Sequence, residues 1–205
     1  HRFVRYLSCI LIGVPVWYVI GVLVSLSQDV FIPELGIDTS ALDATSLKKV
    51  NGNAIKYAYI GLSIGDLLSS LLSQWLRSRK KVIVMYLSAN LILTLIFLFG
   101  MRGASIATYN WLCLALGMAT GYWVIFVTVA SEQFGTNIRS TVATTTPNFV
   151  RGAVLPVTYS FSMLAVSVGN VTSALVVGLV CIGAAFWATT RVHETFHKEM
   201  DFVEK

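Results

Sequence analysis

Long runs of apolar residues, separated by short polar stretches, fill most of the sequence. A helix needs about 20 mostly apolar residues to cross a ~30 Å hydrocarbon core. Six segments meet this requirement: residues 6–27, 54–76, 82–101, 108–134, 142–168 and 171–192. They are too long for the strands of a transmembrane barrel and lack its two-residue alternation. The pattern therefore predicts an all-α, polytopic membrane protein with six transmembrane helices, multi-pass in the cell membrane.

The composition also indicates a lipid environment. Of 205 residues, 56% are hydrophobic and 12% are charged, whereas soluble domains carry about 25% charged residues. A soluble fold of this length could not bury so much apolar surface. The first segment is longer than the apolar region of a signal peptide, and no small-residue cleavage site follows it, so we interpret it as a span.

Lysine and arginine are distributed unevenly between the two ends of the predicted spans. An even number of spans places both termini on one side of the membrane. Cytoplasmic connections are enriched in these residues, so both termini are predicted to be cytoplasmic. The net charge of +5 then reflects topology and contact with membrane lipids, and it predicts no nucleic-acid partner. The predicted cytoplasmic side carries Arg2, Arg5, Arg77, Arg79, Lys80, Lys81, Arg139, Arg191, Lys198 and Lys205, against Lys48, Lys49, Lys56 and Arg102 on the other.

Two predicted spans carry a charge near their middle. Asp66 precedes the end of its span at Leu76, and Arg151 follows the start of its span at Val142, each by about 15 Å at 1.5 Å per residue. A charge at this depth is costly unless it faces protein or water. The two residues are therefore predicted either to share an aqueous cavity or to form a structural ion pair. Each lies in a polar stripe: Tyr59, Ser63, Asp66, Ser70 and Ser73 in one helix, and Thr144, Asn148, Arg151, Tyr159 and Ser162 in the other.

A proline and two glycine motifs also predict how the helices bend and pack. Pro15 predicts a kink in the first span, beside Trp17 and Tyr18. The sequences GLSIG (61–65) and GMATG (117–121) have small residues four apart, which lets helix backbones approach closely.

The connection between the first two predicted spans, residues 28–53, is the longest. Asp38 or Thr39 is predicted to cap a short surface helix that ends near Val50, before the turn NGN (51–53). This outer loop either covers the bundle or gates an entrance to it.

The residues needed for a hydrolytic or metal site are not placed together. His1, His193 and His197 are terminal, which leaves no histidine for a serine-based or zinc site within the bundle. Asp66 has no second carboxylate at its depth. We therefore expect no enzyme activity and no metal or other cofactor.

Residues 131–152, SEQFGTNIRSTVATTTPNFVRG, resemble the signature between helices ten and eleven of major facilitator superfamily transporters. The similarity is to the sugar-porter, organic-ion and synaptic-vesicle-glycoprotein branches, whose pattern is Glu-x-Phe-Pro-Thr-x-x-Arg-x-Thr. Gly135 replaces the proline, and Arg151-Gly152 followed by Pro156 resembles the organic-ion branch. The residues that match in register are Glu132, Phe134, Thr136, Arg139 and Thr141.

Two further stretches resemble the same superfamily in the expected order. RSRKKV (77–82) is similar to the basic loop between helices eight and nine, with Gln74 where many members have an acid and a spacing one residue longer. HETFHKEMDFVE (193–204) is similar to the Pro-Glu-Thr-x-Gly tail, with Glu194 and Thr195 matching and histidines replacing Pro and Gly.

The resemblance implies that the six spans are helices seven to twelve, the C-terminal half of a twelve-helix carrier, with residues 193–205 as a cytoplasmic tail. Such carriers alternate between inward- and outward-open states around a central site. The chain would then be part of a longer carrier and would need the N-terminal six-helix half of the same transporter as its partner.

The resemblance also implies roles for individual residues. Arg151 would attract a carboxylate or other anion, and Asp66 would carry a proton or hold Arg151 when the site is empty. The residues predicted to line the same cavity are Trp17, Tyr18, Tyr59, Asn148 and Tyr159. A cytoplasmic gate cluster would consist of Glu132, Arg139, Arg77, Arg79, Lys80 and Lys81, although Arg139 is equally explained as a topological anchor.

The function expected from these features is proton- or ion-coupled secondary transport of a small polar or anionic solute, with sugar not excluded. A transport-inactive membrane interaction module, as some relatives in the synaptic-vesicle branch are, remains an alternative. So does a six-helix channel or homodimeric carrier.

Overall fold

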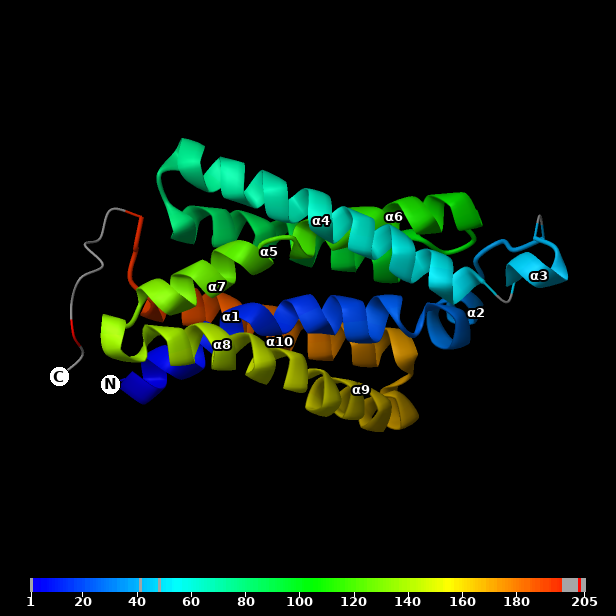
Figure 1. Ribbon diagram of the computed structural model, residues 1–205. Helices are drawn as coiled ribbons and strands as arrows, with labels where there is room; N and C mark the ends of the chain where they lie inside the picture. Colours follow the sequence, from blue (N-terminus) through cyan, green and yellow to red (C-terminus); the bar gives the residue numbers. More distant parts are fainter. Residues whose placement is uncertain (1, 41, 48, 197–202, 204–205) are drawn as a thin grey trace.

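The computed structural model describes residues 2–40, 42–47, 49–196 and 203, and these form a helical bundle (Figure 1). The described residues contain no β-strand beyond one isolated bridge between Asp38 and Ser105. The predicted all-α class is therefore confirmed for this part of the chain. The helices are α1 (Arg2–Tyr18), α2 (Ile32–Glu34), α3 (Ala44–Leu47), α4 (Val50–Leu76), α5 (Arg79–Leu95), α6 (Ile106–Thr120), α7 (Trp123–Glu132), α8 (Thr136–Gly152), α9 (Val154–Val168) and α10 (Asn170–Arg191), with π-helical segments η1 (Val19–Val24), η2 (Ser27–Phe31) and η3 (Ile96–Gly100).

Among the described residues, five helical segments are long and apolar enough to cross a membrane. The remaining predicted span corresponds to α4, which has 27 residues and is about 40 Å long. It is not among the five, because Lys56, Asp66 and four serines make its composition more polar. The five segments are Arg2–Val24, Arg79–Gly100, Ile106–Glu132, Thr136–Val168 and Asn170–Arg191.

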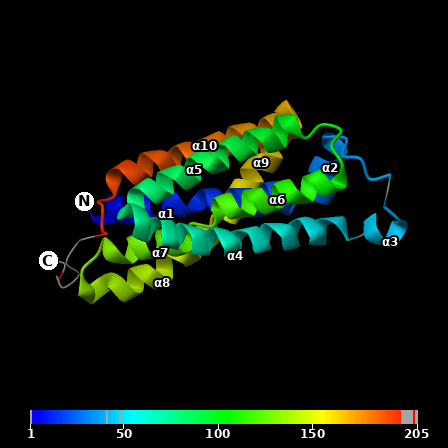
Figure 2. The ribbon, with the colours of Figure 1, turned by 90° about the horizontal axis from the view of Figure 1, so that it is seen from above.

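The long helices run along one common direction. The start of α1, the end of α10 and the α4–α5 and α7–α8 turns lie at one end, and α2, α3 and the α5–α6 and α9–α10 connections lie at the other (Figure 1). Seen from above, α4 runs beside α6, and α5 runs beside α10 (Figure 2). The end that holds the α1 start thus also holds most of the basic residues.

Three buried tyrosines tie the helices together through hydrogen bonds. Tyr18 donates to the carbonyl of Ala174 at 2.7 Å, and Tyr122 donates to the carbonyl of Ile12 at 2.8 Å. Tyr109 donates to Ser27 Oγ at 2.7 Å. Because each phenol is satisfied, burying it does not leave an unpaired polar group in the core.

The two glycine motifs pack against each other at the crossing of α4 and α6, as the spacing of small residues predicts. A Cβ atom at Gly61 would lie 2.0 Å from the carbonyl oxygen of Leu114, and one at Gly117 would lie 2.0 Å from that of Ala58. Only glycine permits backbones to approach this closely.

The predicted span 108–134 is broken near its middle. Helix α6 ends at Thr120 and α7 begins at Trp123, with Gly121 and Tyr122 outside both helices. A Cβ atom at Gly121 would lie 2.4 Å from the Cα of Gly65. Direct backbone contact with α4 therefore occurs at the break.

Two other predicted spans are interrupted close to a proline. The span predicted at 142–168 begins earlier, at Thr136, and is interrupted at Ala153 between α8 and α9. Pro156 lacks the N–H that would bond the Gly152 carbonyl, so the helix loses a hydrogen bond there. In α1, Pro15 precedes the passage to the π-helical η1, at the place where a kink is predicted.

The outer loop differs from its predicted form. The Asp38 carboxylate accepts from Ser40 N–H at 2.9 Å, and its backbone pairs with Ala104, so it forms a turn and caps no helix. The short helix α3 is capped by Asp43 instead, and α4 already begins at Val50. The predicted turn NGN is therefore helical.

Candidate functional site

A cavity of about 230 Å³ lies where α1, η1, α4, α7 and α8 meet. The charged group of this cavity is Arg151, which lies near the middle of the Thr136–Val168 segment. We call the cavity the Arg151 cavity. Its walls are mostly aromatic and aliphatic, an arrangement typical of small-molecule sites. The lining residues are Val16, Trp17, Ile20, Tyr59, Leu62, Trp123 and Arg151.

The guanidinium of Arg151 is held from two sides. Its Nη1 donates to Asn148 Oδ1 at 3.2 Å, one turn earlier in α8. Its Cζ lies 5.5 Å from the ring centroid of Trp123, within the range of a cation–π interaction. Among the described residues, no carboxylate forms an ion pair with Arg151. The positive charge therefore remains available to another group.

Asp66 and Arg151, for which the sequence allowed an ion pair, do not form one in the described part of the chain. The Asp66 carboxylate instead accepts from the N–H of Val124 at 3.2 Å, in the first turn of α7. The break between α6 and α7 leaves the first N–H groups of α7 without helical partners, and one of them, from Val124, bonds the carboxylate where Arg151 does not.

The aromatic wall carries an unsatisfied donor. Trp17 and Trp123 contact edge to face, with ring centroids 6.4 Å apart. The Nε1–H of Trp17 is buried and has no hydrogen-bond partner among the described residues. A buried N–H without a partner costs free energy, and neighbouring protein atoms cover this one.

Some of the residues predicted for the cavity belong to it and others do not. Trp17 and Tyr59 line it, and Asn148 contacts it through Arg151. Tyr18 is buried against α10, because neighbouring residues on a helix point about 100° apart. Tyr159 is 66% exposed on α9 and does not line the cavity. It lies eight residues, or about 12 Å, beyond Arg151, on the far side of the interruption at Ala153.

Trp123 and Leu62 line the cavity and were not predicted. Trp123 owes its position to the break before α7. The signal in the sequence was Gly121, which ends GMATG directly before Tyr122-Trp123, but the glycine was interpreted only as a packing residue.

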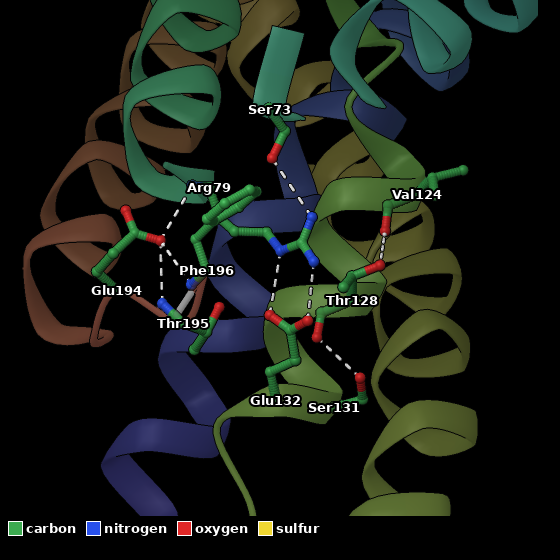
Figure 3. Close-up of polar contacts among 9 residues, drawn as sticks. All are labelled: Ser73, Arg79, Val124, Thr128, Ser131, Glu132, Glu194, Thr195 and Phe196. Atoms are coloured by element: carbon green, nitrogen blue, oxygen red, sulfur yellow. Dashed lines mark hydrogen bonds and ion pairs between the residues drawn. The ribbon is translucent and has the colours of Figure 1, made fainter. Parts of the chain in front are cut away.

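A second polar cluster lies at the end of the bundle that holds the start of α1 (Figure 3). Arg79, at the start of α5, binds both oxygens of Glu132, at the end of α7. Its Nη2 lies 2.9 Å from Oε1 and its Nε 3.1 Å from Oε2. The two side chains are only 16% and 8% exposed, so this bidentate pair is largely shielded from water.

Glu194 caps the start of α5, a role that the sequence did not predict. Its carboxylate accepts from Ser78 Oγ and from the N–H groups of Arg79, at 3.0 Å, and Lys80, at 3.2 Å. Burial alone would raise the pKa of Glu194, but these bonds and the N–H of Phe196 outweigh it and hold the pKa below its ordinary value. An anion at this position also interacts favourably with the helix dipole.

Two other predicted gate residues donate to backbone carbonyls. Lys80 Nζ donates to the Val192 carbonyl at 2.9 Å, and Arg139 Nε donates to the Phe134 carbonyl at 3.3 Å. Arg77 is exposed, with a φ of 48° at the end of α4, and Lys81 is also exposed.

Gln133, also not predicted, joins α7 to the tail. Its side-chain Nε2 donates to the His193 carbonyl at 2.7 Å, and its Oε1 accepts from the His193 N–H. The tail thus contacts the bundle through residues 193–196, and residues 197–202, 204 and 205 lie outside the described part of the chain.

Glu194→Gln is expected to lower the melting temperature at neutral pH, and the difference from wild type should shrink on acidification. The folded-state pKa is depressed, so the stabilisation is complete above the ordinary value of 4.5 and is lost as pH falls through the lower folded value. The measurement is thermal unfolding of wild type and Glu194→Gln from neutral to acid pH. Asp29→Asn, at the other end of the bundle, is the control. An undiminished difference at acid pH would contradict the role of the charge.

Comparison with known proteins found no matching family model, no matching curated protein and no matching solved structure. The function is therefore argued from the geometry of the site and from the sequence motifs.

Proposed function

We propose that the chain is one six-helix half of a secondary transporter of the major facilitator type, and that the Arg151 cavity binds the anionic group of its solute. The observation that carries this proposal is an arginine midway along a helical segment long and apolar enough to cross a membrane, without a carboxylate partner among the described residues. A charge at that depth cannot face lipid without a large cost. It must face an aqueous cavity, another protein surface or a ligand.

The surroundings of Arg151 favour a ligand. The guanidinium supplies several N–H donors at the cavity. Carboxylates and phosphates accept bonds from such donors, and arginine binds them in a bidentate manner. The aromatic walls would contact the apolar part of a small organic anion.

The exposed polar residues around the cavity support a second half as partner. Ser63 on α4 and Thr144 and Asn148 on α8 are exposed, and Thr128 on α7 is half-buried. Carriers of this type enclose their site between two six-helix halves and alternate access by rocking. In this proposal the second half covers these residues, both termini are cytoplasmic in the cell membrane, and the Arg79–Glu132 pair forms part of the cytoplasmic gate.

Arg151→Ala is expected to reduce uptake of anionic solutes by about ten- to a hundredfold, the factor for losing a charge-assisted hydrogen bond. The measurement is uptake of labelled carboxylates, sulfonates and neutral sugars into vesicles containing the complete polypeptide. Solute-dependent thermal stabilisation of the purified protein gives a second readout.

Arg191→Ala is the matched control, because Arg191 lies at the end of α10 against Trp187, away from the cavity. Unaltered uptake and affinity in Arg151→Ala would overturn the site. The absence of stabilisation or uptake with any solute would instead favour an interaction module.

A further inference from the structure

We propose that Asp66 is a positioning residue: by capping α7 from α4, it holds Trp123 against Arg151 and leaves Arg151 unpaired for the solute. This inference rests on the proposed function of the Arg151 cavity. It assigns Asp66 a role different from proton transfer.

The first step is the close approach of α4 to the helix break. A Cβ atom at Gly121 would lie 2.4 Å from Gly65 Cα and 2.6 Å from the backbone nitrogen of Asp66. The two glycines therefore bring the backbone of Asp66 into direct contact with the residues that precede α7. A larger residue at either position would move the carboxylate away from α7.

The second step is the cap itself. Tyr122 precedes α7 and supplies no side-chain cap. Asp66 Oδ1 instead accepts from Val124 N–H at 3.2 Å. The start of a helix carries orphan N–H groups and the positive end of the helix dipole. These stabilise the carboxylate in the bundle without a cationic side chain.

The third step connects the cap to the cavity. Trp123 is the first residue of α7, so its backbone position depends on that first turn. Its ring lies 5.5 Å from Arg151 Cζ, and its centroid lies 6.4 Å from that of Trp17. A frayed first turn would displace the ring that supports the guanidinium, while Arg151 itself would remain.

The test compares Asp66→Ala, which removes the acceptor, with Asp66→Asn, which keeps an acceptor oxygen and removes the charge. Asp66→Ala is expected to speed hydrogen exchange at the amides of Trp123 and Val124 by about tenfold, the factor for a lost helix cap. It is also expected to raise the KM for a carboxylate solute, with the maximal rate little changed. Asp66→Asn should restore both quantities to within about threefold of wild type.

Ser88→Ala, on α5, is the control, because the Ser88 hydroxyl donates to the Val84 carbonyl of its own helix and lies outside the cavity. Unchanged amide exchange in Asp66→Ala would overturn the cap. Loss of uptake, or of its dependence on a pH gradient, in Asp66→Asn would overturn positioning and identify a proton carrier.

The two proposals can fail separately. If wild-type protein transports and binds none of the solutes, the proposed function fails, and positioning fails with it. Faster amide exchange in Asp66→Ala would then show that the cap itself is present. If Arg151→Ala abolishes uptake and Asp66→Ala leaves KM unchanged, only the positioning role fails.

Discussion

Gly61→Ala is expected to destabilise the protein by about 3 kcal/mol, the upper end of the usual range for overpacking. The added Cβ atom would lie 2.0 Å from the carbonyl oxygen of Leu114. Because that atom is backbone within α6, no side-chain rotation can relieve the contact, and the two helices must separate. Separation would also remove contacts of the neighbouring Gly65–Gly121 pair. Thermal or denaturant-induced unfolding in detergent micelles measures the effect.

Gly183→Ala provides the matched control for this substitution. Gly183 lies within α10, and a Cβ atom there would meet nothing within 4 Å. The same chemical change should therefore be neutral or stabilising by up to about 1 kcal/mol, since alanine favours helix more than glycine does. Equal effects of the two substitutions would show that backbone contact does not determine stability at Gly61.

Removal of one partner of the Arg79–Glu132 pair is expected to cost about 3–5 kcal/mol, because the other charge stays largely buried without a partner. Both Glu132→Gln and Arg79→Gln should show this loss in the free energy of unfolding. The double substitution should cost less than the two single losses together, since no unpaired charge remains.

Lys81→Gln is the control for a change of basic charge at the same end of the bundle, because Lys81 is exposed. It is expected to change stability by less than about 0.5 kcal/mol. Additive effects of Glu132→Gln and Arg79→Gln in the double variant would mean that the pair does not act as a unit.

Arg79 also contacts Ser73 and the ring of Phe196, so Arg79→Gln is expected to be the more costly of the single changes.

Much of the helical architecture could be predicted because its signals are local. The apolar runs predicted helices at the right places, and Gly61 and Gly117 marked where two of them could approach closely. The internal breaks were harder to predict. Each break depends on a single residue, such as Gly121 or Pro156, that leaves the surrounding apolar run intact.

The candidate site was less predictable than the helices that carry it. Arg151, Trp17 and Tyr59 line one cavity, as the helical stripes indicated, whereas Tyr18 and Tyr159 lie elsewhere. A stripe assumes one continuous helix, and the interruption at Ala153 ends that continuity before Tyr159. The cap formed by Glu194 could not be recognised either, because it joins residues more than one hundred positions apart.

The amino-acid sequence by itself determined the helical class, the approximate bounds of the long helices and the positions of Asp66 and Arg151 along them. These follow from hydrophobicity and from the fixed rise of a helix. Only the tertiary structure decided that the two charges do not pair. The rotation of each helix and the break before α7 place the Asp66 carboxylate at backbone N–H groups and Arg151 at an aromatic cavity. Which polar groups meet depends on how the helices are oriented against one another, and a linear pattern does not contain that information.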